Sequence, residues 1–182
     1  MWEGNGQAPG VRGNPLSLPR EARSFIDRYR LVPHPEGGWY REVHRSTRSV
    51  GLLPGYSGER AALTAIYFLL AAGEFSAFHR VASEEVWIHL AGGALELVLL
   101  ANELRLLTLA PAGDGGEPLL VVPPGTLQAA RPHGPFTLAA CLVAPGFDFA
   151  DFEIPPLEEL EAAYPRHVEL VRRFSHPGSP VL

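Results

Sequence analysis

Cysteine is almost absent from this chain, which has Cys141 as its single cysteine among 182 residues. No intrachain disulfide can form, and this usage favours a cytoplasmic protein. The chain also lacks an apolar run long enough to span a bilayer. Its first residues lack the charged-then-apolar pattern of a secretory signal. We see no internal repeat, phosphate-binding glycine loop or paired-cysteine zinc motif. These absences exclude a disulfide scaffold and predict no association with a membrane.

Positive charge is also scarce, since 15 Lys and Arg stand against 20 Asp and Glu, for a net charge of -5. Nucleic-acid binders usually carry a basic patch, so we expect no nucleic-acid partner. The length suits one domain with a sizeable core. We place a flexible leader at 1–16, the domain at 17–175 and a tail at 176–182.

Turn-forming residues are abundant, with 19 Gly and 18 Pro, and they favour short strands over long helices. Helical spacing occurs only near the ends, at 19–29 and at 157–174, the second broken at Pro165. The predicted strands, separated by turns, are 39–45, 64–70, 86–90, 95–100, 104–109, 119–122, 136–143 and 147–154. About eight short strands with terminal helices predict an all-β sandwich or barrel.

The most informative stretch is Gly73–Gly92, which contains the predicted strand 86–90. Side chains alternate between the two faces of a strand, so Glu85, Trp87 and His89 share one face. The opposite face carries only aliphatic residues. A face with a carboxylate, an indole and an imidazole predicts the lining of a cavity, in which Trp87 is expected to form a wall.

A second titratable face is expected on strand 39–45, where Tyr40, Glu42 and His44 alternate. A solvated edge strand is the simplest interpretation of that face. The loop before it, which contains His34 and Glu36 between prolines and glycines, is most simply loop architecture with Glu36 capping backbone amides. A lid over a pocket is the alternative interpretation.

The spacing from Gly73 to Gly92 resembles the first motif of the cupin superfamily. Five residues separate Gly73 from His79, and Glu85 and Gly92 follow at the expected intervals. Val81 occupies the position of the second histidine. The second motif is weaker: Pro123 and Gly125 fit, but Gln128 occupies the position of its histidine.

The whole chain resembles one branch of small single-domain cupins, long catalogued as a domain of unknown function. The segments that carry this resemblance are Leu31–Gly38, Phe78–Arg80, Glu85–Trp87, Val122–Gly125 with Ala129–Arg131, and Ala144–Glu153. The resemblance implies a double-stranded β-helix, or jelly roll, with a pocket in the barrel mouth and a homodimer. It implies no settled activity, although relatives of the branch have been compared with sugar-nucleotide epimerases and sugar-phosphate isomerases.

The resemblance also implies a divalent transition metal, which a typical cupin binds with three histidines and a glutamate. This chain would have to use His79, Glu85 and the amide oxygen of Gln128, a weak set for such a metal. His89 lies about 13 Å beyond Glu85 along an extended strand and cannot share a metal with it. Whether a metal is bound stays open at this point.

Our leading hypothesis is an enzyme that epimerises or isomerises a carbohydrate-like or other small polar carbonyl compound. His79 and Glu85 would be its acid–base centre, because both side chains can hold protons near neutral pH when buried. A ligand-binding cupin without catalysis is the alternative, and a metal-dependent oxygenase is a third. The expected ligand-binding residues are Tyr40, His44, Tyr67, Trp87, His89, Gln128 and Arg131, the last as a candidate anion anchor.

Overall fold

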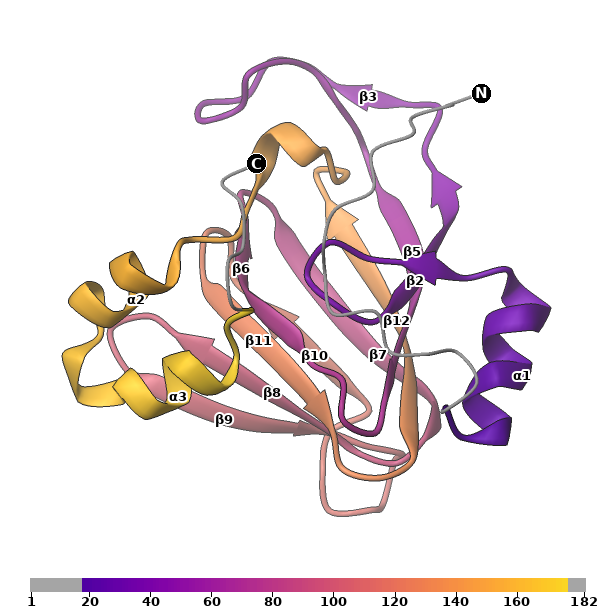
Figure 1. Ribbon diagram of the computed structural model, residues 1–182. Coiled ribbons are helices and arrows are strands. Elements are labelled where there is room, and N and C mark those ends of the chain that lie inside the picture. The colour runs from indigo at the N-terminus through magenta and orange to yellow at the C-terminus, as the bar shows by residue number, and fades with distance from the viewer. Residues whose placement is uncertain (1–17, 177–182) are drawn as a thin grey trace.

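Two antiparallel β-sheets packed face to face form the body of the protein, as a computed structural model shows for residues 18–176. The order of the larger sheet is β1-β2-β5-β12-β7-β10, and that of the smaller is β13-β6-β11-β8-β9. Figure 1 shows the two sheets as the walls of an open barrel. The predicted all-β jelly roll with terminal helices is confirmed.

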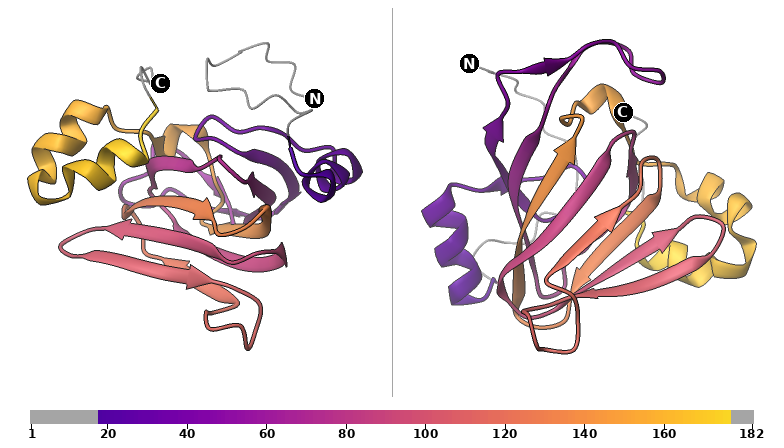
Figure 2. Two further views of the ribbon diagram at one scale, coloured as in Figure 1. Left: turned by 60° about the horizontal axis from the view of Figure 1, so that its bottom comes forward. Right: turned by 180° about the vertical axis from the view of Figure 1, so that it is seen from behind.

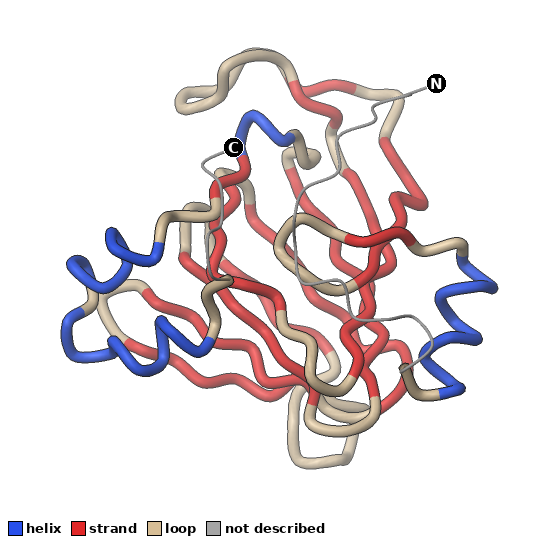
Figure 3. The backbone as a smooth tube through the Cα atoms, in the orientation of Figure 1, coloured by secondary structure: helices blue, strands red, loops and turns tan. Residues whose placement is uncertain are grey.

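The strands of the larger sheet are β1 (Val32–Pro33), β2 (Trp39–Arg45), β5 (Thr64–Ala71), β12 (Phe136–Ala144), β7 (Glu84–Gly92) and β10 (Leu119–Val122). Those of the smaller are β13 (Phe152–Glu153), β6 (Ser76–Val81), β11 (Leu127–Pro132), β8 (Leu95–Leu100) and β9 (Leu104–Leu109). A separate pair joins β3 (Ser49–Val50) to β4 (Arg60–Ala61). The tube drawing in Figure 3 shows how strands dominate the chain.

Helices lie only on the outside of the barrel, as the two further views make clear (Figure 2). Helix α1 (Arg20–Tyr29) covers part of the outer face of the larger sheet, where it packs on β5 and β12. The pair α2 (Leu157–Ala163) and α3 (Val168–Arg173) packs on the smaller sheet. A 3-10 turn at Pro165–His167 separates α2 from α3, as the predicted break at Pro165 required. No helix among residues 18–176 is long and apolar enough to cross a membrane.

Two strands of the smaller sheet were not among those predicted. Strand β6 carries His79 and β11 carries Gln128, and the two pair with each other at these residues. Strands buried on both faces lack the polar alternation by which strands are recognised, and β6 and β11 are buried over most of their length.

The predicted strand 147–154 is wrong over most of its length. A 3-10 turn, η2 (Phe149–Asp151), occupies its centre, because the Asp148 carboxylate accepts a hydrogen bond from the Ala150 amide at 2.9 Å. Only Phe152–Glu153 pair as a strand, against the end of β6. The predicted leader at 1–16 lies outside the described residues, as does most of the predicted tail. His176, the first residue of that tail, stacks on Phe75 with ring centroids 4.6 Å apart.

Candidate active site

A cavity of about 520 Å³ opens between the two sheets. Its walls come from β2, β5, β7 and β12 of the larger sheet, from β6, from the loop before β2 and from the segment around η2. The residues that line it are His34, Glu36, Tyr40, Glu42, Arg45, Thr64, Ile66, Phe68, His79, Val81, Glu85, Trp87, Cys141, Val143, Phe147, Asp148, Phe149 and Phe152. Half of them are aromatic or aliphatic, and the titratable groups among them lie in two places, deep in the cavity and at its rim.

Strand β7 supplies Glu85 and Trp87 to the cavity. Both are buried, and the residue between them points to the opposite face of the sheet. Their partners across the ladder are Val143 and Cys141 of β12, which line the cavity too. The alternation of a strand therefore brings the carboxylate and the indole to one wall, as the sequence pattern predicts.

Gln128, on β11 of the smaller sheet, joins the two polar groups of this wall. The Trp87 indole can only donate, and its Nε1 donates to Gln128 Oε1 at 3.1 Å. This fixes the orientation of the amide, so that Gln128 Nε2 donates to Glu85 Oε2 at 2.5 Å. Gln128 therefore holds Glu85 in place from outside the cavity lining.

The loop between β1 and β2 brings two further titratable residues deep into the cavity. Glu36 Oε2 lies 3.3 Å from His79 Nε2 and 3.4 Å from His34 Nδ1. Glu36 Oε1 accepts a hydrogen bond from the Ser76 hydroxyl at 2.9 Å. The expectation that Glu36 caps backbone amides is wrong, because its carboxylate faces a hydroxyl and two imidazoles instead.

Glycine at position 37 lets this loop approach β6. Gly37 has φ +112°, and a Cβ there would lie 2.1 Å from the Phe75 carbonyl oxygen. The Ala77 amide donates to the Glu36 carbonyl oxygen at 2.8 Å, and His176 Nε2 lies 3.1 Å from that oxygen. The backbone of Glu36 is thus held from β6 and from the C-terminal segment.

The hydrogen bonds locate the protons of the two imidazoles. His79 Nδ1 lies 2.8 Å from the Ala77 carbonyl oxygen, an acceptor, so Nδ1 carries the proton and Nε2 is free to accept. His34 Nδ1 accepts the Glu36 amide at 3.4 Å, so it too presents a lone pair. Glu36 Oε2 therefore faces two lone pairs, and this arrangement is favourable only when Glu36 carries a proton.

Burial shifts the pKa of each deep group toward its neutral form. Burial, reinforced by the neighbouring His79, lowers the pKa of His34 to about 3. Burial raises the pKa of Glu36 to about 8, against the opposing effect of the Ser76 hydrogen bond. It also lowers the pKa of His79, although Glu85 opposes this. Near neutral pH the deep groups are therefore mostly uncharged.

Glu85 has the same tendency, because burial raises its pKa against the opposing effect of His79. Its Oε2 accepts the Gln128 amide, so the proton of neutral Glu85 resides on Oε1. Burial also raises the pKa of the Cys141 thiol well above its ordinary value. Cys141 is therefore a neutral wall residue rather than a nucleophile.

The side chains at the cupin metal positions do not fit a transition metal. Val81 has no donor atom, and Gln128 has already committed its oxygen to Trp87 and its nitrogen to Glu85. Only His79 and Glu85 remain, fewer than the three or four ligands such a metal requires. Among the described residues no group of three or more His, Cys, Asp or Glu side chains is arranged to hold a metal ion.

Tyr40 and Trp87 line the cavity, but the other five residues predicted to bind ligand do not, and Gln128 is one of these five. Tyr67 is on the outer face of β5 and packs on Tyr29 of α1, with ring centroids 4.8 Å apart. Arg131 pairs with Glu96 at 2.7 Å on the outer face of the smaller sheet.

His44 and His89 were also predicted to bind ligand, and they too lie outside the cavity lining. The pairing of β2 with β5 shifts register between Glu42 and His44, so that Arg45 faces the cavity and His44 is exposed on the other side. His89 is half-buried further along β7, where Nε2 lies 3.1 Å from the Gly93 carbonyl oxygen.

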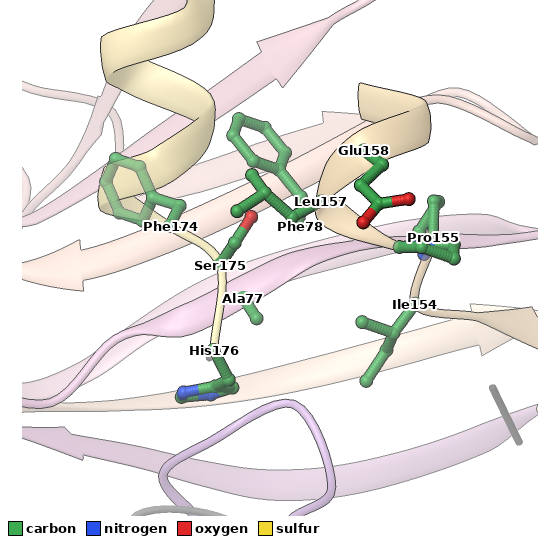
Figure 4. Close-up of a pocket in the computed structure, with 10 residues that line it drawn as sticks. Ala77, Phe78, Ile154, Pro155, Leu157, Glu158, Phe174, Ser175 and His176 are labelled. Atoms are coloured by element: carbon green, nitrogen blue, oxygen red, sulfur yellow. The ribbon is translucent and has the colours of Figure 1, made fainter. Parts of the chain in front are cut away.

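A second, smaller cavity of about 330 Å³ lies beside the Glu36 loop. Figure 4 shows its largely apolar walls, with Phe78 and Phe174 on one side and Ile154 and Pro155 on another. It shares no lining residue with the first cavity.

Comparison with known proteins agrees with the fold. A hypothetical protein from Leishmania major is 32% identical, with a TM-score of 0.79, over 86% of this chain and 99% of that chain. A protein from Shewanella oneidensis is 37% identical, with a TM-score of 0.76, over 85% of this chain and 96% of that one. A cupin 2 domain-containing protein from Halorhodospira halophila has a TM-score of 0.54 at 18% identity, over 81% of this chain and 89% of that one, and shows the fold alone.

The fold and these likenesses define a cupin. Residues 23–155 match the family described as Cupin superfamily (DUF985), and the chain belongs to that family. No curated protein matches the chain.

Proposed function

We propose that this protein is a small-molecule enzyme that moves a proton at a carbon next to a carbonyl group, as in epimerisation or isomerisation. The observation that carries the proposal is the meeting of Glu36, His79 and Glu85 in one cavity, with Glu36 Oε2 3.3 Å from His79 Nε2. Such a reaction needs one group that takes a proton and another that gives one, and it needs no redox partner.

Glu36 is the proposed base. Its pKa of about 8 lies near a physiological working pH, where a carboxylate is both present and strongly basic. When Glu36 takes the proton from the substrate carbon, its Oε2 can again donate toward His79 Nε2. The two imidazole lone pairs thereby favour the proton transfer to Glu36, and the Ser76 hydroxyl, which donates to Oε1, holds its carboxylate in position.

Glu85 is the proposed acid. As the C–H bond breaks, the electron pair moves to the carbonyl and the oxygen accepts the proton from Glu85, which gives a neutral enol. Return of a proton to the opposite face of the same carbon epimerises it. In an α-hydroxy carbonyl compound the enol is an enediol, and isomerisation is completed when the proton on Glu36 moves to the neighbouring carbon while the Glu85 carboxylate takes back a proton from the other hydroxyl. Gln128 stabilises the Glu85 carboxylate that is formed transiently, because its amide donates to Oε2.

Exchange of carbon-bound hydrogen for deuterium in D₂O tests this proposal without knowledge of the substrate. The protein is incubated with aldoses, ketoses and cyclohexanone, and loss of the proton signals next to the carbonyl is followed by NMR. We expect exchange with at least one of them, reduced by roughly a hundredfold or more in Glu36→Gln and in Glu85→Gln.

His44→Gln is the matched control, because His44 is an exposed histidine outside the cavity. Its exchange rate should equal that of the unmodified protein. If no carbonyl compound that binds in the cavity is exchanged, the enzyme proposal is refuted and the ligand-binding cupin takes its place.

A further inference from the structure

Arg45 is the only Lys or Arg among the described residues that line the larger cavity. Its Nε and Nη2 donate to the two oxygens of Glu42 at 3.0 and 2.6 Å, and its Nη1 donates to the Phe147 carbonyl oxygen at 3.1 Å. All three nitrogens of the guanidinium are therefore engaged at the rim. Glu42 already neutralises Arg45 there, so the described lining offers no unpaired Lys or Arg to bind a phosphate or a carboxylate inside.

The deep end of the cavity offers hydrogen-bonding groups that burial biases toward their neutral forms. Glu36 and Glu85 are carboxyl groups whose pKa values burial raises, and His34 and His79 are imidazoles whose pKa values burial lowers. A carboxyl group that stays neutral can donate a hydrogen bond to an oxygen of a ligand, as in enzymes that stabilise an enol.

Most of the remaining wall is hydrocarbon. It consists of Ile66, Phe68, Val81, Trp87, Val143 and Phe152. Phe68 and Trp87 contact each other edge to face, with ring centroids 5.5 Å apart, and form a rigid apolar surface. The cavity therefore has a polar deep end, an apolar body and a charged rim.

We propose that the cavity takes an uncharged carbonyl compound with a mainly apolar, ring-sized body, and that it rejects carboxylated and phosphorylated analogues. The carbonyl oxygen would accept the hydrogen bond from Glu85, and the ring would lie against Phe68 and Trp87. This inference rests on the proposed function only for the role of Glu85 as donor. It excludes the sugar nucleotides and sugar phosphates with which relatives have been compared.

The physical reason is desolvation. An anion that enters a cavity without a free cation loses its hydration and gains no compensating contact, which costs several kcal/mol. The uncharged compound loses only the hydration of its carbonyl, which Glu85 replaces. We therefore expect a preference of about tenfold or more for the uncharged member of a matched series.

Isothermal titration with cyclohexanone and cyclohexanecarboxylate at pH 6.5 tests the inference, because these probes share a six-membered ring and differ in charge. Cyclohexanone should bind at least tenfold more tightly than the carboxylate. Equal or tighter binding by the carboxylate overturns the inference, and so does the absence of cyclohexanone binding at tens of millimolar.

Two neighbouring substitutions on β12 locate the binding. Val143 faces the cavity, whereas Leu142 faces the opposite side of the sheet. Val143→Phe fills part of the cavity and should abolish cyclohexanone binding, and Leu142→Phe should leave it unchanged, each in protein shown to be folded by circular dichroism. Binding that survives Val143→Phe would place the ligand elsewhere and overturn the inference.

The failure of this inference and that of the proposed function are distinguishable. Selective binding of cyclohexanone without deuterium exchange refutes the proton-transfer enzyme and leaves the ligand class intact. Tight binding of the carboxylate refutes the ligand class, whether or not exchange occurs.

Discussion

The pH dependence of stability follows from two buried groups, Glu36 and His34, that both favour their neutral forms. Their contributions to the free energy of unfolding change with pH in opposite directions, because one is an acid and the other a base. The folded-state pKa of Glu36 is about 8, against an ordinary 4.5. Its contribution to stability is complete below pH 4.5 and is lost as the pH rises toward 8. The folded-state pKa of His34 is about 3, against an ordinary 6.5. Its contribution is complete above pH 6.5 and is lost as the pH falls toward 3.

The magnitude follows from about 1.4 kcal/mol per pH unit for each group. Between pH 4.5 and 6.5 the two slopes cancel, so the free energy of unfolding is nearly constant in that range. From pH 6.5 to 8 Glu36 acts alone, and about 2 kcal/mol of stability is lost. From pH 4.5 down to 3 His34 acts alone, with a loss of similar size. Glu85 adds to the alkaline loss and His79 to the acid loss, because burial shifts their pKa values in the same directions.

Urea unfolding followed by circular dichroism from pH 4 to pH 8.5 measures this profile. Glu36→Gln removes a titrating group and keeps a hydrogen-bonding side chain, so the alkaline loss should shrink markedly. The difference in stability between the variant and the unmodified protein should change by up to about 5 kcal/mol from pH 4.5 to pH 8, in favour of the variant. Parallel profiles over this range would refute the assignment of a buried, neutral Glu36.

Three further outcomes are expected. Gln128→Leu leaves the Trp87 indole and the Glu85 carboxylate without their shared partner. Urea unfolding should therefore show that the free energy of unfolding falls by about 1–3 kcal/mol. A fall of less than about half a kcal/mol would contradict the hydrogen-bond network. Gly37→Ala places a Cβ against a backbone oxygen at a positive φ, which should lower the free energy of unfolding by about 1–3 kcal/mol. Because the loop carries Glu36, the variant should also slow the exchange of substrate hydrogen for deuterium. An unchanged exchange rate would show that this loop geometry is not needed for the reaction. The expected homodimer should appear in light scattering after size-exclusion chromatography. The outer face of β7 and β10 is a candidate contact, because Leu119 and Val121 are 47% and 43% exposed there. Leu119→Glu should then yield a monomer, and a monomeric unmodified protein would contradict the expectation.

Sequence alone determined the class of fold and part of the site. Turn residues at short intervals, with helical periodicity only near the ends, predict an all-β domain, since such segments can bury their apolar faces only by pairing into sheets. The motif spacing and the alternation along β7 were enough to predict His79, Glu85 and Trp87 as cavity residues, and the structure brings all three to one cavity. These inferences succeed because they depend on local periods.

Tertiary structure decided what depends on contacts between distant segments. Nothing local showed that Glu36 would reach His79, which lies 43 positions away, because the loop enters the barrel only through the close approach of Gly37 to Phe75. The nearest hint was the density of prolines and glycines around two titratable residues, which indicates a special loop without saying where it points.

Irregular strand pairing and contacts between distant side chains determined how the remaining site residues are oriented. The register shift in β2 turned His44 to the outside and Arg45 to the rim, a change that strict alternation cannot predict. The orientation of the Gln128 amide depends on Trp87, which lies 41 positions earlier in the chain and can only donate. The sequence by itself therefore determined the barrel and one wall of its cavity, whereas the acid–base contact and the identity of the rim residues were decided by packing between segments remote in the chain.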